Sequence, residues 1–237
     1  MAESTPQTTE RSVLIVGASR GLGYAMAAEF AARDWRVLGT VRSDATPLHD
    51  LAIERPRNVE VAELDLTDDG QIGALRDRLS GRSFDIVFVS AGIANRRTAD
   101  TLAEVSTEEF AEVMEVNVLG VMRAVEAFGG LVRDGGVIGA MSSGQGSIAN
   151  NTNGTNDVYR ASKAALNQAM SSYAARHRSQ DRAMVLLAPG WIRTEMGGPQ
   201  APFGVEESIP LLVDLLIAQQ RTPGLRFLDR KGEVVPW

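Results

Sequence analysis

The 237-residue sequence predicts an α/β fold: a single-domain, doubly wound parallel sheet of Rossmann-like form with helices on both faces. Short apolar runs recur along the chain without polar alternation, as in strands that are buried on both faces. Helical patterns separate these runs, and that alternation indicates a doubly wound sheet. No repeat or internal linker interrupts the pattern. We therefore expect one domain over residues 11–237, preceded by a disordered polar tail at 1–10.

The first half of the chain alternates as this fold requires. The apolar run SVLIVG is followed by an Ala-rich helical stretch, and farther along Ile72, Leu75 and Leu79 share one helix face. A Ser-Thr pair beginning at Ser106 suits the N-terminus of a long helix. The patterns predict strands at 12–17, 35–42, 58–66 and 84–92, and helices at 23–34, 69–79 and 106–128.

The second half continues the alternation. The patterns predict strands at 135–143 and 182–191, helices at 158–179 and 205–220, and a closing strand and turn at 225–237. Between them, the polar loop GQGSIANNTNGTN at 144–156 is longer than a plain connection needs. A loop of this length and composition indicates a functional site.

Charge and composition exclude several classes of protein. The net charge is −6 and the isoelectric point is about 5.1, so no general basic field attracts nucleic acid or an anionic membrane. No apolar run approaches the roughly 18 residues of a membrane span, and the N-terminal residues lack the apolar core of a secretory signal. The chain has no cysteine and only two isolated histidines, so we expect no disulfide and no metal site. This composition fits a cytoplasmic protein.

A glycine-rich turn, GASRGLG, joins the first predicted strand to the first helix. A helix N-terminus presents free N–H groups and a partial positive charge, which suit a phosphate. Glycines let the backbone approach a pyrophosphate closely. The spacing of Gly17, Gly21 and Gly23 is not the GxGxxG of the standard dinucleotide fingerprint, so a purely structural tight turn stays open as an alternative.

Arginines stand where the second strand meets the adenosine ribose of a bound dinucleotide. An acidic residue at this point would bond the ribose 2′-hydroxyl and favour NAD. The sequence has Val41 and Arg42 there, and Arg20 lies in the glycine turn. Two guanidinium groups suit a 2′-phosphate, so we expect NADP(H) to be preferred over NAD(H). The alternative is that Arg42 is an ordinary surface arginine.

The segment YRASK places Tyr159 and Lys163 four residues apart, on one helix face. Only two of the 24 basic residues are lysines, so a lysine is an unusual choice here for plain surface charge. An adjacent ammonium favours the phenolate form of tyrosine, and an oxidised nicotinamide adds further positive charge, so the phenol becomes usable as a general acid and base. The alternative is a solvated helix face.

A serine pair, Ser142 and Ser143, ends the strand before the long polar loop. A hydroxyl there could hold the oxygen of a substrate carbonyl. A serine hydrolase is not favoured, because neither histidine is placed to activate a serine and no GxSxG elbow is present.

The order of these motifs resembles the short-chain dehydrogenase/reductase family along nearly the whole chain. The matching pieces are GASRGLG, LDL, SAG, NVLG, MSSGQG, YRASK and PGWIRT. The stretch from PGWIRT to VEES is similar to the subgroup that contains the bacterial C-factor and the insect sniffer carbonyl reductase. Two departures are Val16, where the family often has threonine, and SAG in place of the commoner NAG. Neither departure removes a reacting group.

The resemblance implies roles for individual residues. Tyr159 would be the acid/base, Lys163 its partner, Asn117 part of a proton relay through water, and Ser143 the holder of the substrate oxygen, with Ser142 as the alternative. The candidate cofactor-binding residues are Gly17, Ser19, Arg20, Gly21, Leu22, Gly23, Arg42, Asp65, Leu66, Ala91, Gly92, Tyr159, Lys163, Pro189, Gly190, Ile192 and Thr194. Candidate apolar pocket residues are Ile93, Ala94, Ile148, Trp191 and Met196.

These observations predict an NADP-dependent oxidoreductase that interconverts an aldehyde or ketone with an alcohol by hydride transfer. Two alternatives stay open: a cofactor-binding signalling protein of the C-factor type with little turnover, and a reductase of C=N or C=C bonds. The expected partner is a small-molecule carbonyl or alcohol. Relatives often pair through the helices at 106–128 and 158–177, so a homodimer or homotetramer is a further expectation.

Overall fold

A computed structural model describes residues 10–237, so the predicted tail falls almost wholly outside the described residues. Seven strands form one sheet, in the order β3-β2-β1-β4-β5-β6-β7, and every neighbouring pair is parallel. The predicted fold class is confirmed. The strands are β1 Ser12–Val16, β2 Arg36–Val41, β3 Val59–Glu63, β4 Phe84–Val89, β5 Val132–Met141, β6 Ala183–Ala188 and β7 Gly224–Asp229.

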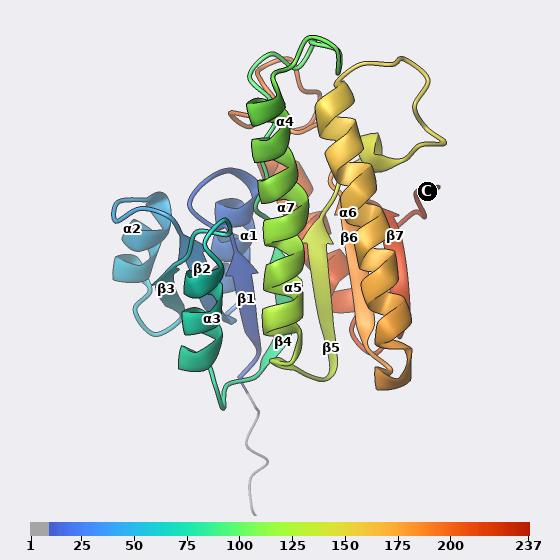
Figure 1. Cartoon of the computed structure of the whole chain (residues 1–237). Helices are drawn as coiled ribbons and strands as arrows, with labels where there is room; N and C mark the ends of the chain where they lie inside the picture. The colour runs from blue at the N-terminus through green and yellow to red at the C-terminus, as the bar shows by residue number, and fades with distance from the viewer. Residues whose placement is uncertain (1–9) are drawn as a thin grey trace, which may run out of the picture.

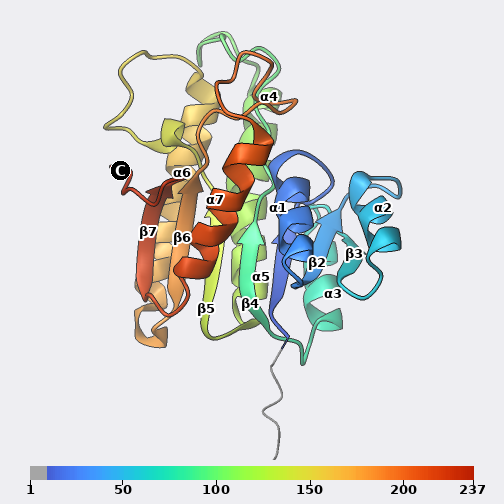
Figure 2. The same ribbon diagram turned by 180° about the vertical axis from the view of Figure 1, so that it is seen from behind.

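Helices cover both faces of this sheet. The α-helices are α1 Gly21–Ala32, α2 Pro47–Glu54, α3 Asp69–Arg78, α4 Thr107–Met114, α5 Val121–Gly129, α6 Asp157–Arg176 and α7 Val205–Ala218. Helices α3, α4, α5 and α6 lie in front of the sheet in Figure 1. The opposite view in Figure 2 shows α1, α2 and α7 on the other face.

Each face of the sheet packs its own apolar cluster. One cluster joins the sheet to α3, α5 and α6, and the other joins it to α1, α2 and α7. The strand β1 supplies side chains to both, because its residues from Val13 to Val16 are fully buried and point alternately to opposite faces. This double burial is the reason why the strands are continuous apolar runs.

The long helix expected at 106–128 is interrupted. A π-helical segment, Glu115–Gly120, separates α4 from α5. At Gly120 an added Cβ would lie 2.7 Å from the carbonyl oxygen of Leu66, so the backbones pack closely here. The interruption is one of hydrogen-bond pattern only, because the backbone stays helical from Thr107 to Gly129. The predicted long helix is therefore present, and a local i, i+4 pattern cannot reveal the extra residue in one of its turns. Such insertions are frequent at functional sites.

The sequence reading also missed the short helix α2. Its buried side chains are Leu48 and Leu51, and Ile53 points away from the core, so its apolar pattern is weak. The signal that could have identified it is Pro47 in the first turn, where proline is favoured. Other differences are shifts of strand ends by a few residues; β5, for example, begins at Val132 rather than at residue 135.

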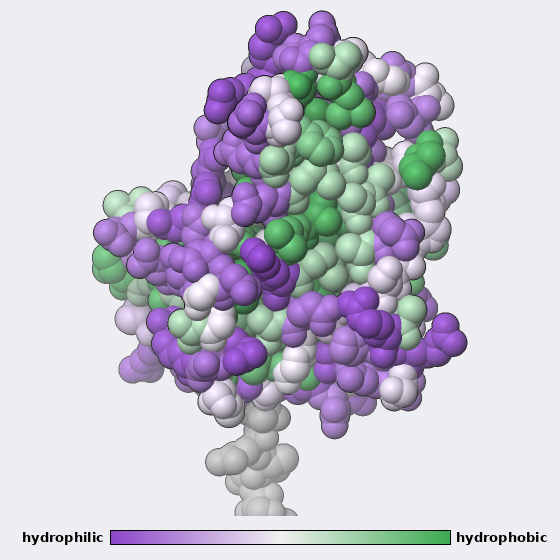
Figure 3. All heavy atoms as spheres, in the orientation of Figure 1, coloured by the Kyte–Doolittle hydropathy of each residue, from purple (hydrophilic) through white to green (hydrophobic). Residues whose placement is uncertain are grey.

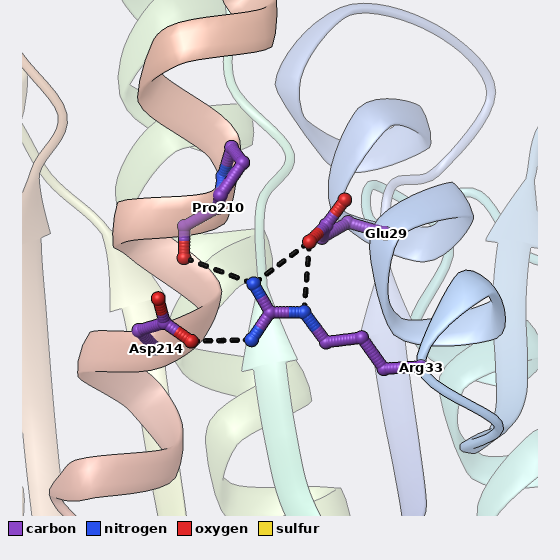
Figure 4. Close-up of polar contacts among 4 residues, drawn as sticks. All are labelled: Glu29, Arg33, Pro210 and Asp214. Atoms are coloured by element: carbon purple, nitrogen blue, oxygen red, sulfur yellow. Dashed lines mark hydrogen bonds and ion pairs between the residues drawn. The ribbon is translucent and has the colours of Figure 1, made fainter.

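One arginine fastens α1 to α7, as Figure 4 shows. Arg33, directly after α1, donates from Nε to Glu29 Oε1 at 2.7 Å and pairs with Asp214 of α7. It also donates to the carbonyl oxygen of Pro210 at 3.4 Å. These contacts join the C-terminal end of α1 to the middle of α7 on one face of the sheet.

The two halves of the sheet wind in opposite directions from β1 and β4, which are neighbours. The chain segments that follow these strands therefore diverge and leave a crevice at the carboxyl edge. Open α/β sheets bind their ligands at such a switch point. None of the helices within residues 10–237 combines the length and the apolar character needed to cross a membrane.

Candidate active site

The glycine turn lies at this switch point and brings two backbones into contact. Gly17 has φ +85°, and an added Cβ would lie 2.7 Å from Ala91 Cβ, in the segment after β4. A Cβ on Gly23 would lie 2.0 Å from the carbonyl oxygen of Gly17, so the first turn of α1 sits directly on the end of β1. The first N–H groups of α1 have no partner within the helix, and the glycines keep the backbone free of side chains at Gly17, Gly21 and Gly23, which fits a pyrophosphate.

A cavity of about 480 Å³ lies beside the turn, toward the end of β2. Its lining residues are Ser19, Arg20, Arg42, Ser43, Ala45, Thr46, Pro47 and Asp65. Both predicted arginines and Asp65 thus border one space, while the stretch from Ser43 to Pro47 was not predicted. Arg42 is exposed, and its predicted part in cofactor binding stays a prediction.

The Asp65 carboxylate is held by its own loop. It accepts hydrogen bonds from the N–H of Thr67 at 2.9 Å and from the Thr67 hydroxyl at 2.8 Å. The Thr67 N–H is the main cause that lowers the pKa of Asp65, and the nearby Arg42 guanidinium lowers it further. Asp65 therefore stays ionised. The following residue, Leu66, is buried against Gly120.

Arg20 makes a contact across the crevice. Its guanidinium pairs with Glu195, which follows the Pro-Gly turn after β6. Both side chains are largely exposed, so this ion pair contributes little to stability. It nevertheless places Arg20 between the predicted cofactor cradle and the segment that carries Thr194.

The segment after β6 turns sharply at Pro189 and Gly190, whose φ is +87°. Ile192 is buried and forms a bridge with Phe203. Thr194 Oγ1 accepts a hydrogen bond from the N–H of Gly197 at 3.0 Å, which closes a tight loop. These residues border the crevice from the side opposite the glycine turn.

Tyr159 and Lys163 lie one turn apart on α6, as the sequence predicts. The Lys163 side chain is only 2% exposed, and Nζ donates to the carbonyl oxygen of Met141 at 2.9 Å. Nζ lies 5.6 Å from the centre of the Tyr159 ring. A Cβ on Gly92 would lie 3.2 Å from Nζ, so the ammonium also borders the segment after β4.

Burial governs the protonation of this pair in the protein alone. Burial raises the pKa of Tyr159 to about 12, and a hydrogen bond with Ser143 opposes that rise. Burial lowers the pKa of Lys163 to about 8. The expectation of a phenol made acidic by the ammonium concerns the protein with a bound nicotinamide and stays a prediction, because in the protein alone burial shifts the pKa in the opposite direction. At neutral pH the tyrosine holds its proton and the lysine is mostly charged.

The two serines after β5 have different surroundings. The Ser143 hydroxyl lies near the Tyr159 phenol and accepts a hydrogen bond from the N–H of Gln145 at 3.1 Å. The Ser142 hydroxyl is fully buried and donates to Asn167 Oδ1 at 2.6 Å. The geometry thus favours Ser143 over Ser142 as the holder of a substrate oxygen. Asn167 was missed by the sequence reading, although it continues the spacing of four residues from Tyr159 and Lys163.

Asn117 lies in the π-helical segment and is fully buried. Its Oδ1 accepts from the N–H of Ile93 at 2.8 Å, and its Nδ2 donates to the Ile93 carbonyl oxygen and to Ser162 Oγ. Both amide N–H groups are therefore engaged. The residue ties the segment after β4 to α6, and its predicted part in a proton relay stays a prediction.

The predicted pocket residues form two groups. Ile93 and Ala94 are partly buried next to Asn117, whereas Ile148, Trp191 and Met196 are more than half exposed. Trp191 is nevertheless fixed, because its ring N–H donates to the carbonyl oxygen of Gly197 at 2.7 Å. Within residues 10–237, no three His, Cys, Asp or Glu side chains cluster in a way that could hold a metal ion.

A nucleotide cradle at the switch point, with the Tyr159-Lys163 pair and a serine at the crevice beyond it, defines an oxidoreductase of the Rossmann type. A family model described as enoyl-(acyl carrier protein) reductase matches residues 17–208. The chain belongs to the short-chain dehydrogenase/reductase family.

Individual relatives agree with this assignment. The C-signal of Myxococcus xanthus is 34% identical over 155 residues, which are 65% of this chain and 92% of the relative. The crystal structure of a short-chain dehydrogenase/reductase from Burkholderia multivorans with bound NADP has a TM-score of 0.95 and 54% identity, covering 97% of this chain and 100% of that chain. A carbonyl reductase from Pseudomonas aeruginosa PAO1 in complex with NADP has a TM-score of 0.89 and 35% identity, with the same coverage.

Proposed function

We propose that this protein is an NADP-dependent reductase of aldehydes or ketones, with Tyr159 as the general acid. The observation that carries the proposal is the arrangement at the crevice. A partly buried phenol lies near the Ser143 hydroxyl and beside a buried lysine, next to a backbone cradle of the kind that binds a dinucleotide. The similarity to NADP-bound relatives supports the choice of cofactor.

Residues from three segments would hold the cofactor. The Gly17–Gly23 turn suits the pyrophosphate, and the cavity lined by Arg20 and Arg42 suits the ribose 2′-phosphate. The ammonium of Lys163 and the loop of Thr194 suit the nicotinamide end. When bound, the cofactor supplies the hydride in reduction and accepts it in oxidation.

The protein's own part in the reaction is to hold and move a proton. The Ser143 hydroxyl holds the carbonyl oxygen of the substrate, and Tyr159 donates its phenolic proton to that oxygen. In the alcohol direction, the tyrosine takes the proton back. The charge of Lys163, one helical turn away, stabilises the phenolate that donation leaves behind.

The test is a panel of aldehydes, ketones and alcohols with each of the four nicotinamide cofactors, read by the absorbance of the reduced nicotinamide. We expect turnover of carbonyl compounds with NADPH, and weaker binding of NADH. Tighter binding of NAD(H) than of NADP(H) would contradict the choice of cofactor. Arg42→Ala should weaken NADPH binding by about tenfold or more while changing NADH binding little, since a charge-assisted contact is lost.

A second candidate is a cofactor-binding signalling protein, which the similarity to the C-signal favours. NADPH binding without oxidation across the whole panel would support it. A third candidate is reduction of C=C or C=N bonds, and the description of the matching family model agrees with the C=C reaction. Enoyl thioesters and imines therefore belong in the panel.

We also propose that the chain pairs with a second copy through the face formed by α4, α5 and α6. Figure 3 shows hydrophobic side chains gathered over these helices, on the face that is turned to the viewer in Figure 1. Leu119, in the π-helical segment, is 47% exposed. The cytoplasmic location expected from the composition stays a prediction.

A further inference from the structure

Asn167 lies two helical turns after Tyr159 on α6 and is buried, with 4% of the residue exposed. Its side chain makes contacts in two directions. Oδ1 accepts a hydrogen bond from the Ser142 hydroxyl at 2.6 Å, and Nδ2 donates to the carbonyl oxygen of Gly146 at 3.2 Å. A single amide therefore holds the chain on both sides of Ser143.

The turn between these contacts is compact. The Gly146 N–H donates to the carbonyl oxygen of Ser143 at 2.8 Å, and the Gln145 N–H donates to Ser143 Oγ at 3.1 Å. A Cβ on Gly146 would lie 3.0 Å from Asn167 Nδ2, so the turn rests directly on the amide. Movement of Asn167 would thus move the whole turn and the hydroxyl that it carries.

Three successive side chains on this face of α6 contact the same segment of chain. Tyr159 lies near the Ser143 hydroxyl, and Lys163 donates to the carbonyl oxygen of Met141. Asn167 is the third member of this row. Because all three stand on one rigid helix, the distances between the phenol, the ammonium and the serine turn are set together.

We propose that Asn167 is a positioning residue, which fixes the Ser143 hydroxyl against the Tyr159 phenol by holding Ser142 and Gly146. The inference rests on the proposed function, since it assigns a role through Ser143. Only an amide fits both contacts, because it offers an acceptor and a donor at once. An aspartate would keep the acceptor and lose the donor, and a leucine would keep neither.

The experiment compares the kinetics of Asn167→Leu with those of the wild-type protein on a carbonyl substrate from the panel. We expect kcat to fall about tenfold or more, as small displacements of a reacting group do, while the Kd for NADPH is unchanged. The matched control is Gln168→Leu, the same type of change at the exposed neighbouring residue, which should leave kcat unchanged.

A double-mutant cycle separates positioning from a general loss of structure. If Asn167 acts through Ser143, then Asn167→Leu causes no further loss of kcat in a Ser143→Ala background. Equal losses in both backgrounds would overturn the inference, and so would an unchanged kcat in folded Asn167→Leu. For variants too slow for steady-state assays, the rate constant of a single turnover at high enzyme concentration replaces kcat in the comparison.

Two further outcomes are distinguishable. If the wild-type protein turns over a carbonyl substrate, and Ser143→Ala loses this activity while Asn167→Leu keeps it, this inference alone is overturned. If the wild-type protein shows no turnover, both the proposed function and this inference are overturned. If Asn167→Leu does not fold, Ser142→Ala removes one of the two contacts and should lower kcat to a smaller extent, again only when Ser143 is present. An unchanged kcat in Ser142→Ala would then count against the role.

Discussion

At the scale of single residues, the phenolic oxygen of Tyr159 is the atom on which the proposed chemistry depends. Tyr159→Phe removes it and keeps the ring that packs near Lys163. We expect kcat to fall by at least about a hundredfold, which is the usual contribution of a positioned acid, with the Kd for NADPH nearly unchanged. Turnover assays and fluorescence titration of NADPH measure the two quantities. Turnover retained at the wild-type level would contradict the role of the tyrosine.

Lys163 illustrates a cost in stability that accompanies such a site. Burial lowers its pKa to about 8, from 10.5. Below pH 8 the folded protein carries a charged, desolvated ammonium, and the full penalty is present. As the pH rises from 8 to 10.5, the folded state loses this proton before the unfolded chain does, so the penalty disappears.

We therefore expect Lys163→Met to be more stable relative to the wild type at pH 7 than at pH 10, by up to about 3 kcal/mol, while it abolishes turnover. The gain should shrink steadily between pH 8 and pH 10, as measured by urea denaturation at several pH values. The control is Lys231→Met, which changes the chain's other lysine, an exposed one. A stability difference that is independent of pH would contradict the explanation.

At the scale of elements, the glycine turn shows how one contact sets the position of a helix. Gly23→Ala places a Cβ 2.0 Å from a backbone oxygen, which cannot move without shifting α1 away from β1. We expect a loss of stability of about 2 kcal/mol or more from overpacking, together with loss of NADPH binding. Thermal unfolding with and without NADPH measures both effects.

The matched control is Gly73→Ala in α3, where an added Cβ meets no atom within 4 Å. Because glycine is unfavourable inside a helix, this change should stabilise the protein by about 0.5–1 kcal/mol. Equal effects of the two substitutions would show that the close contact at Gly23 is unimportant.

At the scale of the whole molecule, the proposed pairing of two chains concerns the face over α4, α5 and α6. Leu119→Glu puts a charge on this face, and we expect it to weaken self-association at least about tenfold, because burying an unpaired carboxylate is costly. Light scattering coupled to size-exclusion chromatography measures the mass. The control is Ile53→Glu, at a 78% exposed position on α2, which lies over the other face of the sheet. A monomeric wild-type protein would contradict the proposal.

The sequence by itself determined the fold class, the glycine cradle and the Tyr159-Lys163 pair. These features depend on local order: apolar runs mark strands buried on both faces, and residues four apart share a helix face. The NADP preference could also be inferred from the sequence, because Arg20 lies in the glycine turn and Arg42 directly follows the second predicted strand. The match to the family extends over most of the chain, so the order of its motifs was informative.

Only the tertiary structure decided what depends on contacts between distant segments. It distinguished Ser143 from Ser142 and brought Asn167 onto the serine turn. It also showed that burial raises the pKa of Tyr159 in the protein alone. The π-helical turn at Asn117 is likewise a feature that only the tertiary structure revealed. Desolvation and packing are properties of the surroundings of a residue in space, and spacing along the chain does not encode them directly.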